Sequence, residues 1–374
     1  MTKKTIVCVV GTRPEAIKMA PVVIALQKQD CFDVKILATG QHAAMLDQAL
    51  GHFELVADVN LHIMKDRQTL DHITSAVLTG AGEYFDAVKP DAVLVHGDTT
   101  TTFAAALAAF YRKIPVGHVE AGLRSGDMYL PFPEEMNRVL TDRITTWSFA
   151  PTALAKENLL KEGTCEDGIS VTGNTVIDAL LYTAANTSKP SLKEFAPLPD
   201  NAQFLLVTAH RRESWGAPLE EICSALTELL DSHKQLWMII PMHKNPAVRE
   251  IIKKHLEGRE RVILCDPLDY PDFVWVMNNA LFILSDSGGV QEEASAIKKP
   301  VLILRDVTER PEAVEHGSGI IVGVDKERIL LHANDLLNNK SSIEKIERKC
   351  DGQPFGDGTA SIQIAEALKL HFNV

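Results

Sequence analysis

Short runs of apolar residues alternate with longer amphipathic segments along the whole chain, and this pattern predicts parallel α/β structure. Several runs are apolar at consecutive positions, as expected for strands that helices cover on both faces. In the first half we predict strands at Thr5–Val10, Val34–Ala38, Ala92–His96, Val116–Val119, Trp147–Phe149 and Ser170–Val171. The second half repeats the pattern, with predicted strands at Phe204–Thr208, Trp237–Ile240, Val262–Cys265, Leu281–Leu284, Val301–Leu304 and Gly319–Val322.

A polar, proline-containing stretch from Ala185 to Asn201 separates the two sets of strands. Such a composition is typical of a crossing between domains. At 374 residues the chain is also longer than one hydrophobic core usually supports. We therefore predict two Rossmann-like, doubly wound domains at residues 1–185 and 186–359, and a final helix at 360–374 that packs back on the first.

The composition, 45% hydrophobic and 24% charged, is that of an ordinary globular protein. A net charge of -12 argues against a large nucleic-acid surface, which needs clustered Lys and Arg. It does not exclude a nucleotide diphosphate, because a few local cations and backbone N–H groups are enough to bind one.

The six cysteines are scattered, without a C-x-x-C pair or metal-ligand spacing, and are interpreted as reduced thiols rather than metal ligands. The apolar run near the amino terminus is too short for a signal peptide or a membrane span. These features predict a cytoplasmic protein that is not inserted in a membrane and holds no metal.

Charged residues follow the predicted strands, where open α/β sheets bind their ligands. Arg13 comes directly after the first strand, at a place where an anion would bind. Lys18 lies in the next helical turns, where it either joins the same site or belongs to a solvated helix face.

Three carboxylates have the same kind of position. Asp98 stands at a strand end and a helix start, so capping the helix is the simpler interpretation of that segment alone. Glu120 follows the next strand and is equally ambiguous. Glu134 and Arg138 share a helical face and form either a weak surface ion pair or part of a site. Their convergence at one end of one domain favours a site.

The second half carries phosphate-binding features. His210 follows a strand and precedes two arginines, which suits a diphosphate. Ser287, Gly288 and Gly289 form a turn that opens a helix, where backbone N–H groups favour phosphate, and Glu293 one turn later can accept hydrogen bonds from ribose. A structural helix cap is the alternative. The loop before Phe273 suits either a nucleotide base or an ordinary packed turn.

Taken in order, these segments resemble the bacterial non-hydrolysing UDP-N-acetylglucosamine (UDP-GlcNAc) 2-epimerases along almost the whole chain. The motifs that carry the resemblance are Gly11-Thr12-Arg13-Pro14-Glu15, His96-Gly97-Asp98, His118-Val119-Glu120-Ala121-Gly122-Leu123-Arg124, Pro133-Glu134-Glu135-Met136-Asn137-Arg138, His210-Arg211-Arg212-Glu213 and Asp286-Ser287-Gly288-Gly289. The resemblance implies a GT-B-like fold with the active site in the cleft between the domains, and a homodimer.

It also implies the reaction: UDP is eliminated to give 2-acetamidoglucal and adds back after C2 is reprotonated, which forms UDP-N-acetylmannosamine (UDP-ManNAc) for surface polysaccharide. No hydride moves, so no cofactor is expected. By resemblance, the reaction site contains Arg13, Lys18, Asp98, Glu120, Glu134, Arg138 and His210, and UDP is held by Phe273, Ser287, Gly288, Gly289 and Glu293. The sequence leaves open which acid transfers which proton.

Some bacterial members are activated by UDP-GlcNAc at a second site, and Gln41, His42, Arg67, Gln68 and His243 resemble parts of it, although Ala44 stands where a polar residue is expected. Three rivals remain: a UDP-sugar-dependent GT-B glycosyltransferase, a hydrolysing epimerase and a non-catalytic nucleotide-sugar sensor. The cluster of acids in the first domain favours epimerisation over transfer and over sensing.

Overall fold

The computed structural model describes residues 3–40, 43–65, 68–211, 214–308, 310–349 and 353–374. The chain forms two compact units. Unit 1 comprises Met1–Ala179 together with Phe355–Val374, and unit 2 comprises Leu180–Pro354. The division falls within α7 (Thr175–Asn186), whereas the sequence placed the end of the first domain near the end of that helix.

Unit 1 is built on a seven-stranded sheet whose order is β3-β2-β1-β4-β5-β6-β7. All its strand pairs are parallel. The strands are β1 (Lys4–Val10), β2 (Phe32–Ala38), β3 (Val59–Asn60), β4 (Ala92–His96), β5 (Val116–Val119), β6 (Trp147–Ala150) and β7 (Ile169–Val171). The order reverses between β1 and β4. Parallel sheets of this kind bind ligands beyond the carboxyl ends of the strands at such a reversal.

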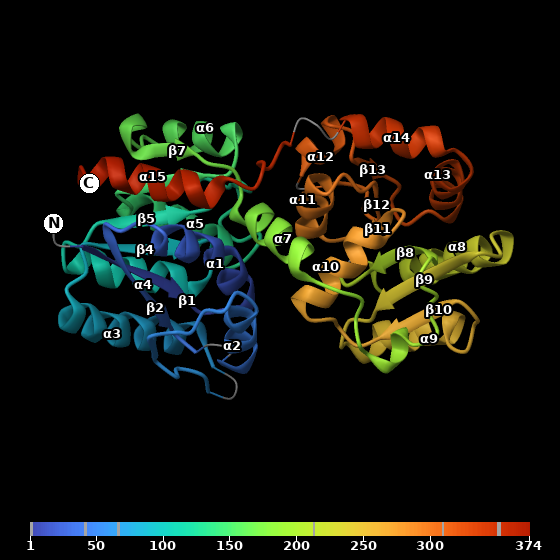
Figure 1. Cartoon of the computed structure of the whole chain (residues 1–374), viewed down its shortest axis with the longest axis horizontal. Coiled ribbons are helices and arrows are strands. Elements are labelled where there is room, and N and C mark those ends of the chain that lie inside the picture. Colours follow the sequence, from blue (N-terminus) through green and yellow to red (C-terminus); the bar gives the residue numbers. More distant parts are fainter. Residues whose placement is uncertain (1–2, 41–42, 66–67, 212–213, 309, 350–352) are drawn as a thin grey trace. The chain divides into compact units, whose positions relative to one another are not determined.

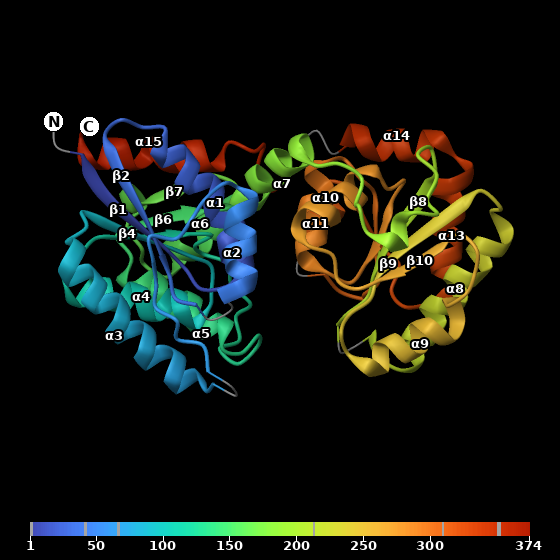
Figure 2. The ribbon, with the colours of Figure 1, turned by 60° about the horizontal axis from the view of Figure 1, so that its bottom comes forward.

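Helices cover both faces of this sheet. They are α1 (Arg13–Gln27), α2 (Ala43–His52), α3 (Leu70–Val88), α4 (Thr100–Tyr111), α5 (Glu134–Ile144), α6 (Ala153–Lys161), the first part of α7, and α15 (Ala360–Phe372). Figure 2 shows α3 and α4 on one face and α1 with α15 on the other. The final helix therefore packs within unit 1 against α1, and the Phe372 ring meets Trp147 edge-on.

Unit 2 repeats the design with six parallel strands in the order β10-β9-β8-β11-β12-β13. They are β8 (Gln203–Thr208), β9 (Leu236–Pro241), β10 (Val262–Cys265), β11 (Ile283–Ser285), β12 (Val301–Ile303) and β13 (Gly319–Ile321). Here the order reverses between β8 and β11. Figure 1 shows the strands of this unit in yellow and orange between their helices.

The helices of unit 2 are α8 (Ala217–Ser232), α9 (Pro246–Leu256), α10 (Tyr270–Asn279), α11 (Gly288–Ala296), α12 (Pro311–Glu315), α13 (Lys326–Asn338) and α14 (Lys340–Lys349). Two hydrophobic clusters hold them to the sheet. In one, Leu205 and Val207 of β8 pack with α8, α9 and α13. In the other, Phe204 and Leu206 of the same strand pack with α10 and α11. Alternate residues of one strand thus serve opposite faces, as the pleat requires.

Two Rossmann-like, doubly wound sheets are therefore confirmed. The predicted strands at Ala92–His96, Val116–Val119 and Val262–Cys265 have the bounds that the structure shows, and the others differ by one or two residues at their ends. The sequence did not predict β3, which is two residues long and lies at the sheet edge. Among the described helices, none combines the length and apolar character that a membrane crossing requires.

Candidate active site

The turn between β1 and α1 is fixed by a capping box. The Thr12 side chain accepts from the backbone N–H of Glu15, while Glu15 Oε2 accepts from the N–H groups of Gly11 and Thr12, both at 2.7 Å. This arrangement makes Arg13 the first residue of α1, with a half-buried side chain at the strand-order reversal of unit 1. The predicted strand-end position of Arg13 is confirmed.

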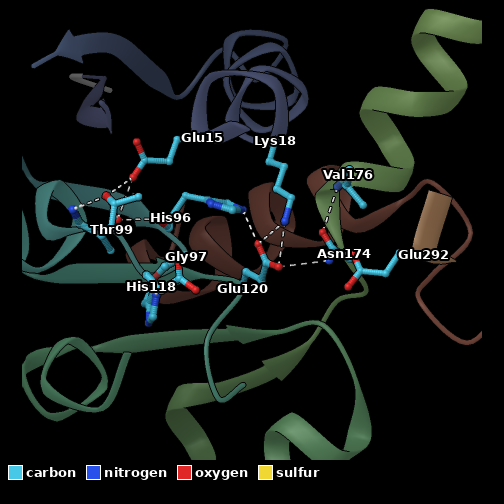
Figure 3. Close-up of polar contacts among 12 residues, drawn as sticks. Glu15, Lys18, His96, Gly97, Thr99, His118, Glu120, Asn174, Val176 and Glu292 are labelled. Carbon is cyan, nitrogen blue, oxygen red and sulfur yellow. Dashed lines mark hydrogen bonds and ion pairs between the residues drawn. The ribbon is translucent and has the colours of Figure 1, made fainter. Parts of the chain in front are cut away.

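Lys18, one turn further along α1, reaches Glu120 at the end of β5 (Figure 3). Its Nζ lies 2.9 Å and 2.7 Å from the two carboxylate oxygens. His96 Nε2 lies 2.9 Å from Glu120 Oε2, and the Glu120 side chain is only 8% exposed. Lys18 therefore belongs to this cluster rather than to a solvated helix face.

The electrostatics of Glu120 follow from these neighbours. Burial alone would raise the pKa of Glu120, but the charges and hydrogen bonds of Lys18 and His96 outweigh it and hold this pKa well below its usual range. The carboxylate is thus ionised at neutral pH. Its backbone has φ +67°, a left-handed conformation that few non-glycine residues adopt, and such outliers gather at functional sites.

Asp98 follows β4, and the structure corrects its simpler interpretation as a helix cap. The cap of α4 is Thr99, whose side chain accepts from the N–H of Thr102. The Asp98 carboxylate instead accepts from Arg138 of α5, at 3.0 Å from Nε and 2.6 Å from Nη2. A charge-assisted pair of this kind fixes the orientation of the carboxylate.

Glu134 and Arg138 do not pair with each other, although they are four residues apart on α5. Arg138 Nη1 donates instead to Glu135 at 3.0 Å, in addition to its bonds with Asp98. The half-buried Glu134 carboxylate makes no hydrogen bond or ion pair within the described part of the chain. Of the two alternatives, the surface ion pair with Glu134 is thus not found in the described structure, and Arg138 instead links α5 to the turn after β4.

In unit 2, His210 lies just beyond β8 and Asp286 just beyond β11, at the strand-order reversal. Asp286 Oδ2 accepts from the backbone N–H groups of His210 and Arg211, both at 2.8 Å, and Oδ1 lies 2.8 Å from His210 Nδ1. Asp286 is completely buried, whereas the His210 side chain is 39% exposed. Burial raises the pKa of Asp286, but His210 and the two backbone donors lower it by more than burial raises it. The net pKa lies below its usual range, so the carboxylate is ionised.

The Asp286 carboxylate also selects the tautomer of neutral His210. When Nδ1 donates to a carboxylate, Nε2 of a neutral imidazole carries the lone pair and can accept a proton. The His210 ring stacks on that of His243, with ring centroids 6.3 Å apart. The partial exposure of the His210 side chain leaves it within reach of a ligand.

The start of α11 has backbone features that can bind an anion. Ser287 is its N-cap residue but makes no side-chain capping bond, and the helix opens with Gly288 and Gly289. The first backbone N–H groups of a helix have no partner within it and favour negative charge. Further along α11, Glu293 accepts from the Tyr270 hydroxyl at 3.0 Å. Phe273 lies on α10 as part of the apolar cluster on that face of the sheet.

The residues suggested for a second, regulatory site are only partly described. Gln41, His42 and Arg67 lie outside the described residues. Gln68 is half-buried in unit 1, and its side-chain oxygen is buried without a hydrogen-bond partner in the described structure. His243 lies in unit 2 beside His210, in contact with a residue of the candidate active site.

Three residues with clear structural roles were not singled out from the sequence. They are His96, which contacts Glu120, Asp286, which holds His210, and Asn174, whose Nδ2 lies 3.4 Å from Glu120 Oε1. His96 ends β4 and Asp286 directly follows β11. Their positions at strand ends could therefore have marked them as site candidates, although their residue types alone did not. Among the described residues, no group of three or more His, Cys, Asp or Glu could hold a metal ion.

Comparisons with known proteins agree with one another. The sequence family described as UDP-N-acetylglucosamine 2-epimerase matches residues 24–369. The chain is 49% identical over 370 residues to the UDP-N-acetylglucosamine 2-epimerase of Escherichia coli O157:H7, covering 97% of this chain and 98% of that protein. Many further curated relatives carry the same name.

Solved structures give the same result. A putative UDP-N-acetylglucosamine 2-epimerase from Listeria monocytogenes is similar with a TM-score of 0.93 and 46% identity, covering 100% of this chain and 97% of that one. The UDP-GlcNAc 2-epimerase of Neisseria meningitidis, solved bound to UDP-GlcNAc, is similar with a TM-score of 0.86 and 46% identity, covering 97% and 99%.

Proposed function

The chain belongs to the UDP-N-acetylglucosamine 2-epimerase family, and we propose that it converts UDP-GlcNAc reversibly into UDP-ManNAc without hydrolysing it. One observation carries the proposal beyond the family name. Glu120, at the ligand-binding edge of the unit 1 sheet, is kept ionised by Lys18 and His96. Inversion at C2 begins with loss of a proton to a base, and an ionised carboxylate at this edge of the sheet is a group that can accept one.

The proposed reaction is elimination followed by addition. A carboxylate of unit 1 takes the C2 proton, the C–H electron pair forms the C1–C2 double bond, and the C1–O bond breaks with its electrons going to UDP. The intermediate is 2-acetamidoglucal. A proton is then delivered to the opposite face of C2 while a UDP oxygen bonds to C1. No hydride is transferred at any step, so the proposed chemistry needs no nicotinamide cofactor.

Acid and base groups are needed on both faces of the sugar, and the candidates are Asp98, Glu120 and Glu134. Their surroundings differ. Glu120 contacts Lys18 and His96, Asp98 is bonded to Arg138, and Glu134 has no polar partner among the described residues. The order in which they transfer protons stays open. Negative charge on the departing UDP would be stabilised by Arg13, Arg138 and His210.

The nucleotide half of the substrate is assigned to unit 2. The N–H groups at Ser287, Gly288 and Gly289 suit the diphosphate. The Glu293 carboxylate suits the ribose hydroxyls as an acceptor, and Phe273 suits contact with the base. The two glycines matter here because a side chain at either position would occupy space that a phosphate needs.

Proton NMR of the purified protein with UDP-GlcNAc in D2O, without metal, NAD or an acceptor, tests the proposal. The expected result is UDP-ManNAc with deuterium at C2. Free ManNAc and UDP would identify a hydrolysing epimerase. Turnover only with an added acceptor would identify a glycosyltransferase, and UDP binding without C2 exchange would identify a nucleotide-sugar sensor.

We also propose a homodimer. Phe110 and Tyr111, at the carboxyl end of α4, are 52% and 65% exposed. They line a cavity of about 620 Å³ together with Ile114, Pro115 and Ile144. A second copy covering these aromatic side chains would remove apolar surface from water. Light scattering after size-exclusion chromatography tests this, and Tyr111→Lys is expected to shift the mass towards the monomer.

Activation by UDP-GlcNAc at a second site is a further proposal that rests on the sequence pattern around Gln41, His42, Arg67, Gln68 and His243. Initial rates with UDP-ManNAc as the reactant should rise when small amounts of UDP-GlcNAc are added. A hyperbolic curve in UDP-GlcNAc, with no such rise, would remove the proposal. The cytoplasmic location, the lack of nucleic-acid binding and the supply of surface polysaccharide stay predictions from the sequence.

A further inference from the structure

His118, in the middle of β5, is a buried histidine with both ring nitrogens engaged. Its side chain is 0% exposed. Nδ1 lies 2.6 Å from Asp142 Oδ1 of α5, and Nε2 lies 2.7 Å from the carbonyl oxygen of Gly97. His118 lies outside the group of residues proposed to contact substrate, so the reaction described above does not account for it.

Figure 3 shows His118 beside Gly97, whose carbonyl group directly precedes Asp98 in the chain. Gly97 has φ +69°, and its N–H donates to the Val119 carbonyl at 2.9 Å. The next carbonyl, that of Asp98, accepts from Asn137 Nδ2 at 2.9 Å. His118 thus holds the residue directly before the candidate acid, and Asn137 holds the acid's own backbone.

The partners of His118 dictate how many protons it carries. A carbonyl oxygen can only accept, so Nε2 must carry a hydrogen to bond with Gly97. Asp142 Oδ2 accepts from Arg124 Nη2 at 2.7 Å and from the N–H of Gly122 at 3.2 Å, both of which favour an ionised carboxylate. An ionised Asp142 can only accept as well, so Nδ1 also needs a hydrogen.

The charges around His118 are consistent with a cation. Burial lowers the pKa of His118, and Arg124 lowers it slightly, but Asp142 and the Gly97 carbonyl raise it more, so the net direction is upward. Glu162 offsets the charge of Arg124, because the guanidinium donates two hydrogen bonds to the Glu162 carboxylate. The neighbours of His118 in the sheet, Val95 of β4 and Ser148 of β6, are not ionisable.

We propose that His118 is a positioning residue that stays protonated around neutral pH, holds the Gly97 carbonyl and so fixes the Asp98 carboxylate where it faces the substrate. It transfers no proton, because neither nitrogen is open to a ligand. The inference rests on the proposed function of Asp98, and its protonation state can be tested without that function.

The first test is NMR of the wild-type protein labelled with 15N-histidine, with the His118 signal assigned by its loss in His118→Gln. The expected spectrum has hydrogens on both ring nitrogens of His118 from about pH 6 to about pH 8. The alternative arrangement, a neutral His118 beside a protonated Asp142, gives one unprotonated nitrogen. That result would overturn the proposal whether or not the enzyme is active.

The second test compares two substitutions that each keep one of the two bonds. The amide of His118→Gln can replace Nε2 and reach Gly97, whereas the shorter amide of His118→Asn can replace Nδ1 and reach only Asp142. Displacement of Asp98 should lower kcat roughly 10- to 100-fold in His118→Asn and less in His118→Gln. KM for UDP-GlcNAc should change little in either, because UDP contacts lie elsewhere.

The outcomes are distinguishable. Equal loss of thermal stability with wild-type kcat in both variants would make His118 a structural residue only and overturn its positioning role. Equal kcat losses in the two variants would also overturn it, since the bond to Gly97 would then not matter. A wild-type protein that forms no UDP-ManNAc refutes the proposed function instead, and leaves the NMR result on His118 intact.

Discussion

Each unit contains a buried aspartate bonded to Nδ1 of a histidine, and the two pairs differ at the other ring nitrogen. In unit 1, Asp142 holds His118, whose Nε2 donates to the Gly97 carbonyl within the core. In unit 2, Asp286 holds His210, whose side chain is 39% exposed. Both carboxylates are ionised, since both of their pKa values lie below the usual range.

The difference indicates that the same pair of residues can serve two purposes. In our proposal, acceptors at both ring nitrogens keep two hydrogens on His118 although burial alone would disfavour the charge. In His210 the side chain is partly exposed, so a ligand could reach the nitrogen that Asp286 does not contact. What a His–Asp pair does is decided by the environment of the nitrogen that the aspartate does not touch.

The largest effect should come from removing the exposed member. In His210→Gln, kcat should fall roughly 10²- to 10⁴-fold, because a group placed for proton transfer or charge stabilisation is lost. Steady-state rates of UDP-ManNAc formation measure it. The matched control is His233→Gln, which replaces a histidine whose ring bonds to Asn334 outside the site and should leave kcat unchanged. A fall of the same size in the control would show that the loss is not specific to His210.

Asp286→Asn should have the next largest effect. An amide in place of the carboxylate no longer favours the hydrogen on His210 Nδ1, so the ring loses its fixed tautomer, and kcat should fall by about 10²-fold or more. The Asn oxygen can still accept from the backbone N–H groups of His210 and Arg211, so the fold should survive. Circular dichroism checks this. Wild-type kcat in Asp286→Asn would mean that the aspartate serves only to hold the backbone.

The corresponding change in unit 1, Asp142→Asn, should lower the free energy of unfolding and not only kcat. It breaks a buried ion pair and leaves Arg124 and His118 without their shared carboxylate, which costs about 3 kcal/mol of unfolding free energy. Urea unfolding measures the cost. Glu220→Gln is the control, because Glu220 pairs with Lys254 and His255 near the surface and such pairs contribute about 0–1 kcal/mol. Equal losses of unfolding free energy in the two variants would mean that burial does not make the Asp142 ion pair more important than a surface pair.

The smallest expected effect is a difference in pH dependence. The pKa of His118 is raised in the folded protein, so its stabilisation is fully present below about pH 6.5 and is lost as pH rises through the folded pKa. The Tm of the wild type should therefore decline on the alkaline side more steeply than that of His118→Gln. Parallel declines of the two Tm values would mean that the pKa of His118 is the same in the folded and the unfolded protein.

Sequence alone placed the strands and the residues at their ends, because buried strands and their flanking turns have a strong local pattern. It could not identify the partners of those residues. The sequence left open whether Arg138 pairs with Glu134 one helical turn away or joins a site, and the structure bonds it to Asp98 across a loop. A helix cap was the simpler interpretation of the Asp98 segment alone, but Thr99 caps α4.

The His–Asp pairs show the same limit more clearly. His118 and Asp142 are 24 residues apart, and His210 and Asp286 are 76 apart. No local periodicity connects such positions. The packing of α5 on β5 brings the first pair together, and the pairing of β8 with β11 brings the second pair together. The number of protons on each histidine then depends on its burial and on whether its other ring nitrogen has an acceptor. Neither can be inferred from the residue types.

The path of the chain through the two units has a consequence for synthesis. Unit 2 is continuous in sequence, while unit 1 needs Phe355–Val374 to complete it, including the helix that packs on α1. On the ribosome, unit 2 can therefore finish folding while unit 1 still lacks a helix and exposes part of its apolar surface. The candidate acids therefore lie in the unit whose folding is completed last.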